Sequence, residues 1–304
     1  MPQEVTASES SSRRPVTLPA LAEKRRRGEP LVMITAYDFP SARIVDSAGV
    51  DMVLVGDSGA EMVLGYPSTV AVSVEEMLML TAAVRRGLRT PLLIADLPFG
   101  SYEVSDEQAV QTAMRFVKQA GADVVKLERG TEVSLSRARA IIGAGVPVMG
   151  HIGLTPQTAT ALGGNRAQGR NVTDATRIAT ELIALQDAGC FAIVLEAMPA
   201  AVTEQLVTLA TVPTIGIGAG PATDGQVLVF HDLLGIRDAG GARFVRRYAE
   251  LQDDMIAGVS AYAADVRSHR YPAAEHCYSI DEAELERIRK SFAQLHTALP
   301  HATQ

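Results

Sequence analysis

Short apolar runs alternate along this chain with longer segments in which apolar residues recur at helical spacing, from residue 31 onward. The short runs are rich in β-branched residues and almost uninterrupted, which is typical of strands buried on both faces of a parallel sheet. We predict eight strands, at residues 31–35, 51–55, 91–95, 122–127, 146–150, 190–195, 213–217 and 226–230.

The segments between these runs carry the signals of helix ends. Residues 73–86 open with Ser-Val-Glu-Glu, a capping-box start, and residues 105–120 and 173–188 begin in a similar way. An Ala-Gly pair separates a helical pattern from a strand at 48–49, 120–121, 144–145 and 188–189. Glycine just past a helix end adopts the left-handed conformation without steric cost, so the chain is predicted to turn repeatedly from helix to strand.

Repeated strand–helix units imply parallel strands joined by right-handed crossovers. Eight such units favour an α/β fold closed into a (β/α)₈ TIM barrel, with an open doubly wound sheet as the alternative. We predict a disordered tail at residues 1–16, a single barrel domain at 17–278, and a C-terminal helix and tail at 279–304. The pattern after Asp232 is mostly helical, and residues 279–296 look amphipathic.

Composition narrows the classes of function. The chain has 304 residues, of which 47% are hydrophobic, which is ample for one large core. Its net charge of −7 argues against partners such as nucleic acid or an anionic membrane. The two cysteines, Cys190 and Cys277, supply no disulfide framework, and no apolar stretch reaches transmembrane length. We therefore expect a cytoplasmic protein, with Cys190 as a buried structural thiol.

Ionisable residues stand at the carboxyl ends of five predicted strands. They are Asp57, Asp96, Lys126 with Glu128, His151 and Glu196. In a parallel barrel these ends lie on one face, which holds the active site of characterised barrel enzymes. Lys126 and Glu128 are two positions apart, so their side chains point to the same side of their strand. The sequence therefore predicts that these side chains converge on one pocket.

Three of these residues, Asp57, Asp96 and Glu128, indicate a metal site. Unpaired carboxylates held close together would repel one another, and one would take up a proton. A hard divalent cation removes this conflict, and all-oxygen ligation suits Mg²⁺. Because Mg²⁺ usually keeps one or two direct carboxylates, we expect some of the three to act through water. The alternative is that each carboxylate only terminates its strand and accepts hydrogen bonds from loop backbone.

Other polar positions carry weaker signals. His151 is predicted to hydrogen-bond a substrate or cofactor, or else to be a satisfied polar group at the barrel mouth. Ser58 has no evident base beside it and is expected to bind substrate rather than to attack it. The glycines of residues 216–220 lack dinucleotide-binding spacing and indicate tight packing. His231 and Asp232 are expected to be structural.

Nine short segments together resemble one known family, that of ketopantoate hydroxymethyltransferase. They are Ile-Thr-Ala-Tyr-Asp at 34–38, Val-Gly-Asp-Ser at 55–58, Ala-Asp-Leu-Pro-Phe at 95–99, Val-Lys-Leu-Glu at 125–128, Gly-His-Ile-Gly-Leu-Thr-Pro-Gln at 150–157, Val-Leu-Glu at 194–196, Gly-Ile-Gly-Ala-Gly at 216–220, Asp-Gly-Gln at 224–226 and His-Asp at 231–232. The resemblance runs from about residue 31 to residue 278, and the order and spacing of the segments make it specific.

The resemblance implies a fold, a reaction and an assembly. The family is similar to the phosphoenolpyruvate mutase/isocitrate lyase barrels, uses Mg²⁺ and 5,10-methylenetetrahydrofolate, and forms homodecamers from two pentameric rings. Its reaction hydroxymethylates 3-methyl-2-oxobutanoate to 2-dehydropantoate, in pantothenate and coenzyme A biosynthesis, through an enolate. By this resemblance the metal site maps to Asp57, Asp96 and Glu128, and 2-oxo-acid binding to Asp57, Ser58, Asp96 and Lys126. Glu196 maps to the general acid/base.

Departures from the family pattern keep two other hypotheses of function open. Gly-Ala-Glu at 59–61 replaces the usual Leu-Gly and adds a carboxylate, Glu61, while Arg129 stands where the family has glycine. Residues 163–169 also depart from the usual Gly-Gly-Tyr-Lys-Val-Gln-Gly. One alternative is a lyase of the same superfamily that cleaves a C–C bond in a 2-oxo acid. The other is a non-catalytic paralogue that serves as an assembly partner.

Overall fold

Eight parallel strands close into a barrel in the computed structural model, which describes residues 13–237 and 242–298. The strands pair in sequence order, and the last pairs with the first. They are β1 (Leu31–Thr35), β2 (Met52–Val55), β3 (Leu92–Asp96), β4 (Val124–Lys126), β5 (Val148–Gly153), β6 (Ala192–Glu196), β7 (Thr214–Ile217) and β8 (Gly225–Leu228). The predicted TIM barrel is confirmed, and the open sheet is excluded.

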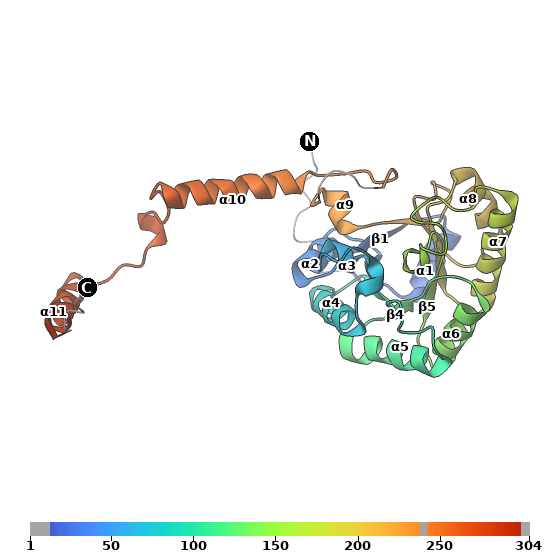
Figure 1. Cartoon of the computed structure of the whole chain (residues 1–304), viewed down its shortest axis with the longest axis horizontal. Helices are drawn as coiled ribbons and strands as arrows, with labels where there is room; N and C mark the ends of the chain where they lie inside the picture. The colour runs from blue at the N-terminus through green and yellow to red at the C-terminus, as the bar shows by residue number, and fades with distance from the viewer. Residues whose placement is uncertain (1–12, 238–241, 299–304) are drawn as a thin grey trace. The chain divides into compact units, whose positions relative to one another are not determined.

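Helices surround the strands (Figure 1). They are α1 (Leu18–Arg26), α2 (Phe39–Ser47), α3 (Gly59–Met62), α4 (Val74–Gly87), α5 (Asp106–Ala120), α6 (Glu132–Gly143), α7 (Val172–Asp187), α8 (Ala200–Leu206) and α9 (Phe230–Leu234), followed by α10 (Leu251–Arg267) and α11 (Glu282–Ala298). Short 3₁₀ turns include η2 (Thr69–Ala71) and η3 (Pro156–Thr158). The helices predicted at 73–86, 105–120 and 173–188 are confirmed as α4, α5 and α7.

Helix ends follow the predicted capping chemistry. The Ser73 hydroxyl accepts a hydrogen bond from the Glu76 backbone N–H, and the Glu76 carboxylate accepts one from the Ser73 N–H at 2.8 Å. Helix α5 ends at Gly121, whose φ of 74° is the left-handed conformation that glycine adopts freely. The local signals were therefore sufficient to place these ends.

Strand side chains alternate between two cores. One set fills the barrel interior and includes Met52, Ile94, Val124, Met149 and Val194. Leu21 of α1 is buried in this set, so α1 packs against the barrel interior.

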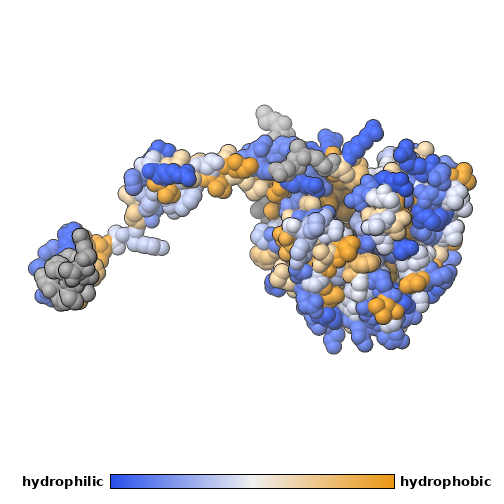
Figure 2. Space-filling model, in the orientation of Figure 1, coloured by the Kyte–Doolittle hydropathy of each residue, from blue (hydrophilic) through white to orange (hydrophobic). Residues whose placement is uncertain are grey.

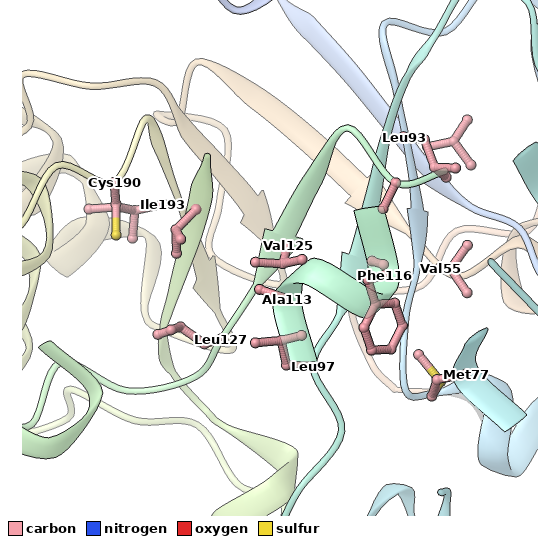
Figure 3. Packing of buried hydrophobic residues seen from close by; sticks show 14 of the residues in the cluster. Val55, Met77, Leu93, Leu97, Ala113, Phe116, Val125, Leu127, Cys190 and Ile193 are labelled. Atoms are coloured by element: carbon pink, nitrogen blue, oxygen red, sulfur yellow. The ribbon is translucent and has the colours of Figure 1, made fainter. Parts of the chain in front are cut away.

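The other set faces the surrounding helices. In Figure 3, Ala113 and Phe116 of α5 lie beside Val125 of β4 in this outer core. Cys190 belongs to the same core and is buried, as predicted, and burial raises the pKa of its thiol to about 12. The barrel is thus filled on the inside and covered on the outside, which leaves the strand ends to carry polar residues.

The carboxyl end of the chain differs from the prediction. The predicted strand at 226–230 is shorter, because β8 ends at Leu228 and Phe230 begins α9. The chain divides into two compact units after Glu250, and the predicted end of the barrel domain at residue 278 stays a prediction. None of the residues of α10 is buried, and Figure 2 shows apolar residues on its surface. The amphipathic helix predicted at 279–296 is observed as α11.

Two further expectations concern the ends and the membrane. The predicted disordered tail lies mostly outside the described residues, but Val16 donates a backbone hydrogen bond to the Thr90 carbonyl at 2.8 Å. Across the described ranges, no helix combines the length and the apolar character that crossing a bilayer would require.

Candidate active site

A cavity of about 1010 Å³ lies at the carboxyl ends of the barrel strands. All seven of the predicted site residues line it: Asp57, Ser58, Asp96, Lys126, Glu128, His151 and Glu196. Five of them are at least 95% buried, whereas Ser58 and Glu196 are only partly so. The convergence that the strand-end positions predicted is therefore present in the fold.

Strand alternation explains why these side chains face the cavity. Met149 and Val194 point into the barrel, so His151 and Glu196, each two positions further along its strand, point the same way. Lys126 follows Val124 by the same rule, and Asp96 follows Ile94. In each of these four strands, β3 to β6, an apolar residue inside the barrel is thus followed two positions later by an ionisable residue that faces the cavity.

A buried ion pair joins two neighbouring strands. The Lys126 Nζ atom lies 2.7 Å from Asp96 Oδ1, and each side chain is 4% exposed. The backbone N–H of Asp57 donates a hydrogen bond to Asp96 Oδ2 at 3.0 Å. Asp96 Oδ1 forms its close contact with Lys126, in a geometry that leaves part of its hydrogen-bonding capacity unfilled. A buried carboxylate oxygen therefore keeps binding capacity toward the cavity.

His151 stands between two carboxylates. Its Nδ1 atom lies 3.3 Å from Glu128 Oε1, and its Nε2 atom lies 3.1 Å from Glu196 Oε2. Burial lowers the pKa of His151 most, and Lys126 also lowers it. The contacts with Glu128 and Glu196 outweigh both influences and raise the pKa to about 9. His151 therefore favours its doubly protonated, charged form at neutral pH, and its Nε2 atom faces Glu196 in an ion pair.

The carboxylates crowd one another. Burial raises the pKa of Asp57 well above its usual value, and the negative charges of Asp96 and Glu128 raise it further. Burial lowers the pKa of Lys126, but the three carboxylates around it outweigh burial and raise that pKa. The cavity thus concentrates negative charge that Lys126 and protonated His151 do not fully compensate.

These features fit a divalent cation. Asp96 Oδ1 is buried with unfilled hydrogen-bonding capacity, and crowding favours a proton or a cation at Asp57. Over the described residues, however, no three His, Cys, Asp or Glu side chains lie close enough to share one metal ion. The donor set therefore suits an ion that takes one or two protein carboxylates and completes its shell with water or substrate oxygens, as Mg²⁺ does.

Gln157 is a site residue that sequence reasoning did not single out. It lies in η3 after β5, is 5% exposed, and contacts both Asp57 and Glu128 through hydrogen bonds. Tyr37 was also missed, and its hydroxyl lies 2.8 Å from Ser58 Oγ. A single glutamine or tyrosine in a loop gives no local signal, so only the contacts reveal these residues.

Part of the departures from the family pattern lies at the rim of the cavity, but Arg129 does not line it. Glu61 lines it from α3, and burial raises the pKa of its carboxyl group while Arg237 lowers it. Arg237 forms an ion pair with Asp232 at 3.2 Å, and both residues line the cavity. The sequence indicated only a structural role for Asp232. His231 packs against the Tyr37 ring with centroids 5.6 Å apart.

The glycine-rich turn after β7 packs tightly, as predicted. A Cβ atom at Gly218 would lie 2.4 Å from the Phe244 ring, and Gly218 has a φ of 62°. Both the space and the backbone conformation therefore require glycine at this position.

Comparisons with known proteins place this geometry in a family. The model of the ketopantoate hydroxymethyltransferase family matches residues 15–274. A 3-methyl-2-oxobutanoate hydroxymethyltransferase of Moorella thermoacetica is 50% identical over 263 residues, which cover 86% of this chain and 97% of the relative. The mitochondrial 3-methyl-2-oxobutanoate hydroxymethyltransferase 1 of Arabidopsis thaliana is 45% identical over 277 residues, which cover 89% of this chain and 80% of the relative.

Solved structures share the fold at much lower identity. Phosphonopyruvate hydrolase superposes with a TM-score of 0.58 at 14% identity, covering 91% of this chain and 97% of the hydrolase. The 2,3-dimethylmalate lyase of the phosphoenolpyruvate mutase/isocitrate lyase superfamily superposes with a TM-score of 0.54 at 15% identity. The match covers 92% of this chain and 99% of the lyase. These likenesses confirm the expected barrel type and concern the fold alone.

Proposed function

This chain belongs to the ketopantoate hydroxymethyltransferase family, and we propose that it transfers a hydroxymethyl group from 5,10-methylenetetrahydrofolate to 3-methyl-2-oxobutanoate. The product would be 2-dehydropantoate. One observation carries the proposal: the full set of ionisable side chains expected from the family lines a single cavity at the barrel mouth.

The same proposal includes Mg²⁺. Asp57, Asp96 and Glu128 would hold the ion, some of them through water, in keeping with the one or two direct carboxylates that Mg²⁺ usually takes. When bound, the ion supplies Lewis-acid polarisation of the oxo-acid carbonyl group. Asp96 Oδ1, which is buried with unfilled hydrogen-bonding capacity beside Lys126, and the crowded Asp57 support this part of the proposal.

Lys126 and Ser58 would bind the oxo acid. Lys126 is a buried cation whose raised pKa keeps it charged, so it would stabilise negative charge that develops on the oxo-acid oxygens when the C3 proton leaves. Ser58 Oγ lies beside the Tyr37 hydroxyl, and burial raises the pKa of Tyr37 and keeps that phenol protonated. Ser58, which lines the cavity, would therefore offer the substrate a neutral hydrogen bond, and Tyr37 behind it would hold the Ser58 hydroxyl in place.

Glu196 would move protons at the one-carbon unit. Its side chain is 15% exposed, more than those of Asp96 and Glu128, and His151 holds its Oε2 atom at 3.1 Å. A carboxylate that is both positioned and accessible suits general acid/base catalysis. His151 would act mainly by fixing the Glu196 carboxylate and would offer a hydrogen bond to the substrate.

The proposal is tested by assaying the purified protein with 3-methyl-2-oxobutanoate and 5,10-methylenetetrahydrofolate, with and without Mg²⁺. We expect 2-dehydropantoate only when all three are present. Asp96→Asn should lower turnover by at least about 100-fold, because it removes a charge that both Lys126 and the cation use. Cleavage of 2-oxo acids without folate would instead favour the lyase alternative, and no turnover with any substrate would favour a non-catalytic paralogue.

We also propose that the chain forms a homo-oligomer, a decamer by its resemblance to the family. The support is that α10 has no buried residue within one chain and exposes apolar side chains such as Ile256, Val259 and Tyr262. Light scattering after size-exclusion chromatography measures the assembly, and a monomer at micromolar concentration would reject this part of the proposal.

A further inference from the structure

We propose that Gln157 is a positioning residue that orients Asp57 and Glu128 and thereby sets the affinity of the cavity for a divalent cation. The inference rests on the metal dependence in the proposed function and concerns a residue to which no role was assigned above. It is carried by the hydrogen bonds of one buried side chain and its backbone N–H.

Gln157 contacts two of the three crowded carboxylates directly. Its Nε2 atom donates a hydrogen bond to Asp57 Oδ2 at 3.0 Å and another to the Leu97 carbonyl oxygen at 3.0 Å. Its backbone N–H donates to Glu128 Oε2 at 3.1 Å. One residue after β5 therefore ties together carboxylates that follow β2 and β4.

The contacts around the amide fix which way it points. The Tyr102 hydroxyl donates a hydrogen bond to Gln157 Oε1 at 2.7 Å and lies 3.4 Å from the Glu128 backbone N–H, which donates to it. Because the Leu97 carbonyl and the Asp57 carboxylate can only accept, the amide nitrogen must face them, and Oε1 is left to accept from Tyr102. The amide is thus satisfied on both sides and has one orientation.

A neutral donor at this position has a specific consequence. The Gln157 amide donates a hydrogen bond to the Asp57 carboxylate and holds it in one orientation. A lysine there would do the same but would compete with a cation for the site. The amide occupies Oδ2 of Asp57, so the other carboxylate oxygen, Oδ1, is the one presented to the cavity. Such outer-shell partners typically change metal affinity 10- to 100-fold when they are removed.

The test is a calorimetric titration of the purified full-length protein with MgCl₂, and with MnCl₂ as a tighter-binding probe, in the absence of both substrates. Gln157→Leu keeps a side chain of similar size but removes the donor to Asp57. We expect its cation affinity to fall about 10- to 100-fold relative to the unmodified protein. Tyr102→Phe leaves the amide in place but frees it to rotate, so we expect a smaller loss in the same direction.

Gln168→Leu is the matched control. Gln168 is a buried glutamine in the same β5–α7 connection, 6% exposed, and its Nε2 atom donates to the Arg166 carbonyl at 2.9 Å. It does not line the cavity, so its replacement should lower the melting temperature without changing cation affinity. Melting curves on all variants separate loss of folding from loss of binding.

Each outcome decides the question. Unchanged cation affinity in folded Gln157→Leu overturns the inference, and so does an equal loss in Gln168→Leu, which would indicate general loosening of the loop. If Gln157→Leu does not fold, Tyr102→Phe decides, and unchanged affinity there is the overturning result. An unmodified protein that binds no divalent cation overturns the metal proposal together with this inference. An unmodified protein that binds the cation as tightly as Gln157→Leu overturns the role of Gln157 alone.

Discussion

Two non-glycine residues adopt left-handed backbone directly after site carboxylates. Arg129, with a φ of 73°, follows Glu128, and Ala197, with a φ of 51°, follows Glu196. Their backbone N–H groups donate to the carbonyl oxygens of His151 and Ile217, both at 2.8 Å. The left-handed conformation is unfavourable for residues with a Cβ atom, so surrounding hydrogen bonds hold strain where the chain leaves the cavity.

Arg129→Gly should therefore stabilise the protein. Glycine relieves the left-handed strain, and its greater freedom in the unfolded chain offsets part of the gain, which leaves about 0.5–1 kcal/mol. Urea unfolding measures the change in free energy. Arg139→Gly, at an exposed position inside α6, is the control and should instead destabilise by about 1 kcal/mol. Equal losses in the two variants would show that the φ of Arg129 stores no strain.

Glu196→Gln should separate chemistry from binding. The amide keeps the shape of the side chain and a contact with His151, but it cannot exchange a proton, so kcat should fall about 10²- to 10⁴-fold. The dissociation constant for 3-methyl-2-oxobutanoate should change little. Steady-state kinetics and calorimetry give the two quantities, and Glu204→Gln, on the exposed side of α8, is the control. A large loss of affinity with unchanged kcat would contradict the assigned role.

At the scale of elements, loops rather than strands complete the cavity wall. Asn165, Arg166 and Ala167 line it from the segment before α7. Asp174 in the first turn of α7 accepts a hydrogen bond from the Gly169 backbone N–H and pairs with Arg177. The start of α7 therefore anchors this segment against the barrel.

Asp174→Asn should lower stability in a pH-dependent way. Burial alone would raise the pKa of Asp174, but the Gly169 N–H and Arg177 outweigh it, and the pKa in the folded protein is lowered. A carboxyl group with a lowered pKa stabilises the fold above its unfolded-state pKa of about 3.9, and this contribution is lost as pH falls through the lower folded-state value. We expect a loss of about 1–2 kcal/mol at pH 7 that shrinks toward pH 3.

Urea unfolding of the unmodified protein and of Asp174→Asn, at pH 7 and near pH 3, measures this difference in the free energy of unfolding. Asp187→Asn, at the exposed other end of α7, is the control and should change stability by less than about 0.5 kcal/mol at either pH. A gap of the same size at both pH values would mean that the Asp174 charge contributes nothing.

At the scale of the whole molecule, the family match and the structure divide the chain differently. The match ends at residue 274, whereas the first compact unit ends at Glu250. Helix α10 is therefore part of the family pattern, and α11 lies beyond the match. This contrast supports a role for α10 in assembly and an accessory role for α11.

A variant that ends at residue 278 tests this division. Since it keeps the family match and removes α11, its melting temperature should lie within about 4 °C of that of the full chain, which corresponds to a change of at most about 1 kcal/mol. Its specific activity should be the same. Shortening the chain further, to residue 250, removes α10 and should reduce the oligomeric state seen by light scattering. A folded, fully assembled protein without α10 would reject its role in assembly.

Most of the elements could be predicted because their signals are local. The Ser73 capping box, Gly121 after α5 and the apolar strand runs each act within a few residues. The alternation of side chains along a strand is also a local property, so the shared inward direction of Lys126 and Glu128 could be inferred before the fold was known. The ends of elements were predicted less accurately where a strand and a helix follow one another closely. Phe230, for example, was predicted to end a strand but begins α9.

Long-range contacts were decided only by the tertiary structure. Gln157 lies 100 positions from Asp57, and a glutamine after a proline looks the same in any loop until the barrel closes and brings the two side chains together. The same holds for Asp232, whose place on the cavity rim depends on how α9 leaves β8. The sequence by itself determined which strands form and which residues end them, because these depend on neighbours along the chain. Which side chains share charge, protons and hydrogen bonds depends on neighbours in space, and only closure of the barrel supplies those.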